Sequence, residues 1–181
     1  MTQILGISGS LRRGSFNTAL LRAAHGLHPE VIRIASIEGI PLYNADVEAA
    51  AFPPTVVALQ QQIAVADGLL LVSPEYNNSV PGVLKNAVDW LSRPSGELRN
   101  VFRDRPVALI GASPGGFGTI LAQNAWLPVL RTLGARHWSG GRLMVSGAQR
   151  VFGEDGSLVN ADIRDRLDGF LRGFIAYCAK T

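Results

Sequence analysis

The chain of 181 residues contains a single cysteine, Cys178, and this scarcity excludes several classes of protein. One cysteine cannot form a disulfide within the chain, and it cannot supply a zinc finger, an iron–sulfur cluster or a CxxC redox pair. We expect Cys178 to be a small buried residue of the last helix. His25 and His28 lie near the end of a predicted helix, where capping or solvation explains them better than metal ligation. With no H-x-x-x-H motif or carboxylate cluster, no metal is expected.

Charged residues and long apolar runs are also scarce. Only 17% of the residues are charged, 47% are hydrophobic, and the formal net charge is +3, which excludes a disordered chain. Apart from Arg12-Arg13 the basic residues do not cluster, so no nucleic-acid partner is expected. The longest strongly apolar run, Leu69–Val72, is far shorter than the ~18 residues of a membrane span. Because the first residues also lack the pattern of a signal peptide, the sequence predicts a cytoplasmic protein without a membrane span.

Short apolar runs alternate with amphipathic segments along the whole chain. The runs predict strands over 4–7, 31–34, 69–73, 107–110 and 142–146. The segments between them predict helices over 16–26, 54–63, 83–91, part of 119–133, and from Asn160 to 175. Pro128 is expected to kink the fourth of these helices or end its first half, and a loop that holds Pro41, Pro53 and Pro54 is expected after the second strand. Strict alternation predicts one α/β domain over residues 1–181, with a five-stranded parallel sheet and helices on both faces.

The loop over residues 9–17 has the composition of a phosphate-binding site. It combines two glycines, serines, Arg12-Arg13 and the start of a helix, whose backbone N–H groups suit an anion. The spacing of Gly9 and Gly14 imitates a Walker A loop, but Ser15 stands where the lysine is required, and no acidic residue ends the third strand. A GxGxxG dinucleotide motif is also absent. The loop therefore predicts a metal-free site for a phosphate monoester, with an ordinary Gly/Ser loop as the alternative.

The loop over residues 73–82 presents groups that suit a planar ring. Tyr76 can lie against such a ring, and the amides of Asn77 and Asn78 can reach its polar edge. The alternative is a surface turn in which the carboxylate of Glu75 is satisfied by the protein.

With both loops in view, the chain resembles the NAD(P)H-dependent FMN reductases, and in particular the bacterial chromate/quinone reductases. The motifs that carry the resemblance are Gly9-Ser10-Leu11-Arg12-Arg13-Gly14-Ser15-Phe16-Asn17, Pro74-Glu75-Tyr76-Asn77, Ser79-Val80-Pro81-Gly82 and Leu84-Lys85-Asn86-Ala87-Val88-Asp89-Trp90. The resemblance implies a flavodoxin-like fold with strand order 2-1-3-4-5 and non-covalently bound FMN.

The resemblance also implies which residues bind the cofactor. The phosphate would be held by Ser10, Leu11, Arg12, Arg13, Gly14, Ser15, Phe16 and Asn17. The ring would be bordered by Pro74, Glu75, Tyr76, Asn77 and Asn78, and on its far side by Ser113, Gly115 and Gly116. Since flavin N5 carries the chemistry, no catalytic side chain is implied. Asn78 departs from the family pattern, because close relatives commonly have a second tyrosine there.

The implied activity is the oxidation of NADPH or NADH and the reduction of a small-molecule acceptor. Quinones are the expected acceptors, with chromate, azo compounds and free flavin as related ones, in a two-electron ping-pong sequence. The family also implies a homodimer or homotetramer, and Trp90, Trp126 and Trp138 are candidates to cover an interface.

Two other functions stay open at this point. One is a flavodoxin-type electron carrier, which is not an enzyme. The other is an esterase, because Gly111-Ala112-Ser113-Pro114-Gly115 matches the G-x-S-x-G nucleophile elbow. Against the esterase, Pro114 has no N–H for an oxyanion hole, and no Asp or Glu separates Ser113 from His137.

Overall fold

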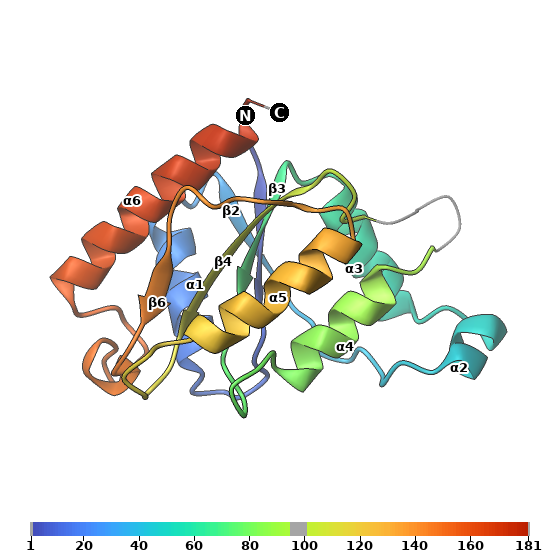
Figure 1. Ribbon diagram of the computed structural model, residues 1–181, viewed down its shortest axis with the longest axis horizontal. Coiled ribbons are helices and arrows are strands. Elements are labelled where there is room, and N and C mark those ends of the chain that lie inside the picture. The colour runs from blue at the N-terminus through green and yellow to red at the C-terminus, as the bar shows by residue number, and fades with distance from the viewer. Residues whose placement is uncertain (1, 95–100, 181) are drawn as a thin grey trace.

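A parallel sheet forms the centre of the computed structural model, which describes residues 2–94 and 101–180 (Figure 1). Its strands are β1 (Ile4–Ser8), β2 (Ile32–Ala35), β3 (Gly68–Val72), β4 (Pro106–Ala112), β5 (Arg136–His137) and β6 (Leu143–Val145). Hydrogen bonds connect them in the order β2-β1-β3-β4-β5, and β6 also pairs with β4. The predicted parallel sheet and its strand order are therefore confirmed.

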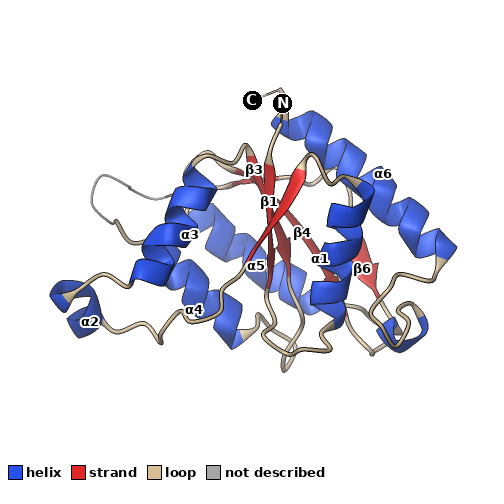
Figure 2. Ribbon diagram, turned by 180° about the vertical axis from the view of Figure 1, so that it is seen from behind, coloured by secondary structure: helices blue, strands red, loops and turns tan. Residues whose placement is uncertain are grey.

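Helices cover both faces of this sheet (Figures 1 and 2). They are α1 (Phe16–Leu27), α2 (Ala45–Ala50), α3 (Pro54–Ala64), α4 (Gly82–Leu91), α5 (Ile120–Thr132), α6 (Ala161–Cys178) and the short 3₁₀ helix η1 (Ala148–Arg150). Along β3, Leu70 and Val72 pack with α1 and α6, whereas Leu69 and Leu71 pack with α3, α4 and α5. Both sides of this strand are thus buried, which explains its uninterrupted apolar run.

The last helix agrees with the sequence pattern. The Oδ1 atom of Asn160 accepts a hydrogen bond of 2.9 Å from the backbone N–H of Ile163, as expected of a helix cap. At the other end of α6, Cys178 is buried, and burial raises the pKa of its thiol to about 12. A thiol with such a pKa stays protonated at neutral pH, so Cys178 serves as a small packing residue.

The edge of the sheet beside β4 contains one strand more than predicted. The fifth strand expected over 142–146 is present as β6, which pairs with the second half of β4, and the two-residue strand β5 pairs with Pro106 and Val107. Between them, the ring of Trp138 packs against Phe170 and Phe174 of α6, with centroid distances of 4.8 and 5.6 Å. The backbone N–H of Trp138 still donates to Val107 O of β4 at 2.8 Å, so the chain leaves the ladder after Trp138 and returns to it at β6.

The loop expected after the second strand, which holds Pro41 and Pro53, also contains the short helix α2. Its first turn is capped by Asn44 through a hydrogen bond of 2.8 Å from Asp46 N to Asn44 Oδ1. Of the two effects expected of Pro128, a kink or an end of the helix, the second does not occur, because α5 continues to Thr132. Pro128 and Asn124, whose carbonyl loses its helical donor, are both exposed, so water can replace the missing bond.

Residues 40–53 form an arm that projects beyond α4 and is attached to it (Figure 1). The side chain of Asn86 accepts a hydrogen bond from Tyr43 N and donates one to Pro41 O, both at 2.8 Å. Trp90 Nε1 donates to the same Pro41 carbonyl at 2.9 Å, and the ring of Tyr43 packs edge-on against Trp90. The arm is therefore held by side chains of α4 that bond to its backbone.

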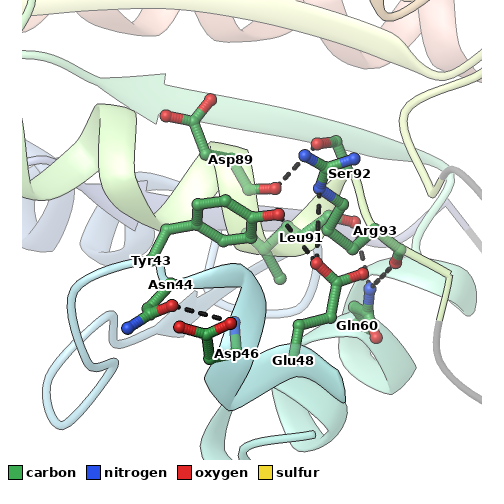
Figure 3. A network of polar contacts seen from close by, with 9 residues as sticks. All are labelled: Tyr43, Asn44, Asp46, Glu48, Gln60, Asp89, Leu91, Ser92 and Arg93. Carbon is green, nitrogen blue, oxygen red and sulfur yellow. Dashed lines mark hydrogen bonds and ion pairs between the residues drawn. The ribbon is translucent and has the colours of Figure 1, made fainter.

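A second group of contacts holds the far part of the arm (Figure 3). Tyr43 Oη donates to Glu48 Oε2 at 2.8 Å, and this hydrogen bond is the main cause that raises the pKa of Tyr43. The guanidinium of Arg93 lies 5.0 Å from the centre of the Tyr43 ring. Gln60 of α3 donates to the carbonyls of Leu91 and Arg93, which fixes the end of α4 beneath the arm.

Replacing Asn86 by alanine should release the arm. The change removes both hydrogen bonds to the arm's backbone, so we expect the free energy of unfolding in urea to fall by about 1–3 kcal/mol. Limited proteolysis should then cleave within residues 40–53 faster than in the wild type.

Lys85→Ala is the matched control on the same helix, because Lys85 forms only a half-exposed ion pair with Asp89. It should cost less than about 0.5 kcal/mol. Equal cleavage rates in Asn86→Ala and Lys85→Ala would show that Asn86 does not hold the arm.

Candidate functional site

The three loops singled out in the sequence follow β1, β3 and β4, so they meet at one edge of the sheet. Ser10 Oγ and Tyr76 Oη lie 3.4 Å apart and connect the loop after β1 with the loop after β3. Gly9 allows this approach, because a Cβ atom there would lie 2.9 Å from both Leu84 and Pro74. The crevice beyond the carboxyl ends of parallel strands is the usual ligand site of such sheets.

The loop after β1, residues 9–15, presents an unneutralised positive charge at the start of α1. Ser15 caps the helix by accepting hydrogen bonds from Asn17 N at 3.2 Å and Thr18 N at 3.3 Å, and the first turn contains no acidic residue. Arg12 and Arg13 are exposed, and neither forms an ion pair with any residue that the structure describes. Backbone N–H groups, a helix N-terminus and free guanidinium groups together suit a phosphate.

Asn17 has a different position from the other polar residues of this segment. It is buried, and its amide exchanges two hydrogen bonds of 2.9 Å with the backbone N–H and carbonyl of Ala112. These bonds attach the first turn of α1 to the end of β4, across 95 positions of the sequence. Asn17 therefore positions the loop after β1, and its side-chain amide is bonded to the protein backbone.

The loop after β3 is a two-residue hairpin, which the sequence analysis did not anticipate. Tyr76 and Ser79 exchange backbone hydrogen bonds of 3.2 and 3.1 Å. Between them Asn77 and Asn78 have φ values of +50° and +60°. Positive φ at both central residues is the pattern of a type I′ turn, and asparagine tolerates it better than most residues do. This gives Asn78 a local reason, since a tyrosine would fit the left-handed backbone less well.

Glu75 fastens this hairpin to α5. Its Oε2 atom accepts hydrogen bonds of 2.9 Å from both Leu121 N and Ala122 N. The N-cap residue of the helix, Thr119, makes no side-chain capping bond, so Glu75 replaces it in that role. The protein itself thus satisfies the carboxylate of Glu75, as the alternative in the sequence analysis predicted. Through these bonds Glu75 positions the hairpin after β3.

The loop after β4 is closed by Ser113. Its Oγ donates a hydrogen bond of 2.6 Å to the carbonyl of Gly118, and its N–H donates to Val145 O at 2.9 Å. The hydroxyl thus bonds to a carbonyl instead of a histidine, which removes the basis for an esterase nucleophile. Gly115 and Gly116 are exposed, and a Cβ atom at Gly116 would have no neighbour within 4 Å. These glycines leave open space beside the hairpin.

A hollow of about 500 Å³ lies between α5 and the edge of the sheet formed by β5 and β6, and no feature of the sequence predicted it. Leu109, Leu127 and Met144 contribute apolar walls, and His137 adds a polar group. Burial lowers the pKa of His137, so the ring is neutral at pH 7. Side chains of α5 on this side, Ile120 and Leu121, are exposed to 44% and 46%.

Two further searches cover only residues 2–94 and 101–180. No helix in this part of the chain is long and apolar enough to cross a membrane. No group of three or more His, Cys, Asp or Glu side chains in the same part could hold a metal ion.

Comparison with known proteins decides the family. The model of the family described as NADPH-dependent FMN reductase matches residues 2–150. The chain belongs to this family. The expected family, fold and oxidoreductase class are thereby confirmed.

Several relatives match nearly the whole chain. An NAD(P)H-dependent FMN reductase of Pseudomonas aeruginosa is 47% identical over 165 residues, covering 90% of this chain and 88% of that protein. A 2-hydroxy-1,4-benzoquinone reductase of Burkholderia sp. is 40% identical over 177 residues, with 97% and 95% covered. Among solved structures, the flavoenzyme NAD(P)H:(acceptor) oxidoreductase FerB of Paracoccus denitrificans has a TM-score of 0.88 at 32% identity, with 99% and 98% covered.

Replacing Glu75 by alanine should loosen the hairpin after β3. The change leaves two N–H groups of α5 without their acceptor and should lower the free energy of unfolding by about 1–2 kcal/mol. Because the hairpin loses its attachment, we also expect FMN to bind at least about fivefold more weakly, which corresponds to ~1 kcal/mol. Flavin fluorescence titration of the apoprotein measures this.

Glu75→Gln provides the control, since its amide oxygen still accepts from the helix without the charge. It should retain most of the FMN affinity. Wild-type FMN affinity in Glu75→Ala would show that the attachment to α5 does not shape the site.

Proposed function

We propose that this protein is an FMN-dependent NAD(P)H oxidoreductase that reduces quinones. The observation that carries the proposal is the contact between Ser10 and Tyr76, which brings the loop after β1 and the hairpin after β3 to one crevice. One loop suits a phosphate and the other suits a ring, which is the division that FMN requires. Relatives named as quinone reductases support the choice of acceptor.

The residues present fit FMN better than a dinucleotide flavin. The loop after β1 offers a single phosphate site with Arg12 and Arg13, and the chain has no GxGxxG motif for a pyrophosphate. Tyr76, Asn77 and Asn78 would border the ring on one side, and Ser113, Gly115 and Gly116 would border it on the other. Held between these loops, FMN would supply the chemistry that accepts a hydride from NADPH or NADH and delivers two electrons to the acceptor.

The chain's own contribution is to position these loops and leave space between them. Glu75 and Ser113 are engaged with α5 and with Gly118, so both loops are fixed by the protein itself. Gly116 carries no side chain, and Asn78 is smaller than the tyrosine common in the family. A flat acceptor can therefore use the same open space after the nucleotide leaves, which supports a ping-pong sequence.

Steady-state assays test this function against that of a flavodoxin-type electron carrier. The purified protein should oxidise NADPH or NADH with a benzoquinone and no other protein, and double-reciprocal plots should give parallel lines. Mass spectrometry of the heat-released cofactor should show FMN.

Chromate, azo dyes and free flavin serve as additional acceptors in the same assay. Turnover that requires a partner protein would support the carrier instead. Release of FAD, or a colourless protein that FMN does not reconstitute, would contradict the proposal.

Arg12 should matter more for FMN binding than Arg13. The backbone N–H of Arg12 donates to Ser10 Oγ at 3.3 Å, and its guanidinium lies 5.6 Å from the ring centre of Phe16, so its position is prepared in advance. A charge-assisted contact contributes roughly 1.5–3 kcal/mol, so Arg12→Ala should weaken FMN binding about tenfold to a hundredfold. Arg13→Ala is the neighbouring control and should lose less. Equal dissociation constants for the two variants would refute this assignment.

We also propose that the protein forms a homodimer or homotetramer. Trp90 and Trp126 are fully buried, so they do not cover an interface. Instead, Ile120, Leu121 and Leu127 on α5 are exposed to 44%, 46% and 40% and form an apolar surface. Light scattering at micromolar concentration should give two or four times the mass of the chain, and Leu121→Glu should lower it. A wild-type monomer would contradict this proposal.

We further propose that the protein is cytoplasmic, because NADPH and NADH, its proposed substrates, are consistent with that location.

A further inference from the structure

A pocket of about 290 Å³ lies on the β2 side of the loop after β1; it shares Arg12 and Arg13 with the site proposed for the FMN phosphate, but its walls on α1 and after β2 have no role so far. We call it the arginine pocket; its lining includes Leu11, Arg12, Arg13, Arg22, Ile34 and Glu38. We propose that the arginine pocket binds the adenosine half of NADPH and holds its 2′-phosphate. The inference rests on the proposed function and adds to it the choice between the two nucleotides.

The charge of the arginine pocket points to a phosphate. Arg22 of α1 is the arginine of the lining that is not assigned to FMN, Arg12 and Arg13 of the loop after β1 are shared with the site proposed for the FMN phosphate, and Glu38 is the acidic residue. Within residues 2–94 and 101–180, none of these three arginines is paired with a carboxylate. Guanidinium groups bind phosphate oxygens through two parallel hydrogen bonds, which makes arginine the usual residue for this purpose.

The remaining lining suits a base and a ribose. Leu11 and Ile34 are exposed to 52% and 45%, so the pocket contains aliphatic surface that a flat base can cover. Glu38 supplies a carboxylate that can accept from a ribose hydroxyl or an exocyclic amine. Its backbone N–H donates to Ser36 Oγ at 3.0 Å, which fixes the turn that carries it.

The position of the pocket agrees with a nucleotide that reaches the ring site. β2 and β3 are the two neighbours of β1, so their ends lie two strand spacings, about 10 Å, apart. The hairpin proposed to border the ring follows β3, and the arginine pocket lies beside the end of β2. The loop after β1, proposed to hold the FMN phosphate, lies between them. A dinucleotide with its nicotinamide at the ring can thus place its other half in the pocket. NADH has no 2′-phosphate and gains nothing from the arginines.

Arg22 is the residue to change, because it lies on α1, outside the loop assigned to FMN. Arg22→Ala should lower the preference for NADPH over NADH, measured as the ratio of kcat/KM values, about tenfold, since a hydrogen bond to a charged group is worth about 1.5 kcal/mol or more. Arg22→Lys keeps the charge without the two-pronged geometry and should lose less. Arg131→Ala, an exposed arginine on α5 outside the pocket, is the control.

A binding measurement tests the pocket independently of turnover. Isothermal titration should show that adenosine 2′,5′-bisphosphate binds the purified holoprotein more tightly than adenosine 5′-monophosphate, and that Arg22→Ala removes this difference. The FMN content of Arg22→Ala is measured in parallel.

Each other result overturns a definite statement. An unchanged nucleotide preference with unchanged bisphosphate affinity overturns the inference. Loss of FMN from Arg22→Ala also overturns it, because the pocket would then belong to the FMN phosphate site. Quinone reduction by a protein that does not bind the bisphosphate overturns the inference and leaves the proposed function intact. Failure to oxidise either nucleotide overturns the proposed function.

Discussion

The two hydrogen bonds between the Asn17 amide and the backbone of Ala112 are the constraint on which the site depends. They are buried, and they join the first turn of α1, the helix that follows β1, to the end of β4, although β3 separates β1 from β4 in the sheet. A buried amide with its oxygen and one N–H paired to a backbone unit has little freedom to move, because breaking either bond would leave a polar atom unsatisfied. The loop after β1 is therefore fixed relative to the loop that begins at Ser113.

The polar contacts of the other two loops build on this constraint. Glu75 holds the hairpin after β3 against α5, and Ser113 holds the loop after β4 against Gly118. All three loops are thus positioned by bonds within the protein, before any ligand binds. A ligand that enters a site prepared in this way does not have to order the loops, which reduces the entropic cost of binding.

Two helix N-termini lie at the same edge of the sheet and are treated in opposite ways. The N-terminus of α5 receives the carboxylate of Glu75, so the protein itself neutralises its partial positive charge. The first turn of α1 has no acidic residue, and Arg12, Arg13 and Arg22 add positive charge around it. This asymmetry directs anionic groups to the β1 and β2 side of the crevice and leaves the β3 and β4 side for an uncharged ring.

The sequence by itself determined the class of fold and predicted where the cofactor site lies. Alternating apolar runs and amphipathic segments predicted the parallel sheet, because strands such as Gly68–Val72 bury both faces and carry their pattern locally. The family motifs predicted that the loops after β1 and β3 form the cofactor site. The Asn77-Asn78 pair could also have indicated the hairpin, since two consecutive residues that tolerate positive φ favour a type I′ turn.

What each polar side chain bonds to was decided only by the tertiary structure. Glu75 reaches Leu121 across 46 positions and Asn17 reaches Ala112 across 95, and no local pattern specifies such partners. The chain leaves the ladder of β4 after Trp138, whose ring packs on α6, and the arginine pocket combines residues of α1 with the turn after β2. Periodicity and turn chemistry act over a few residues, whereas these contacts depend on how whole elements pack, and so they become visible only in the folded chain.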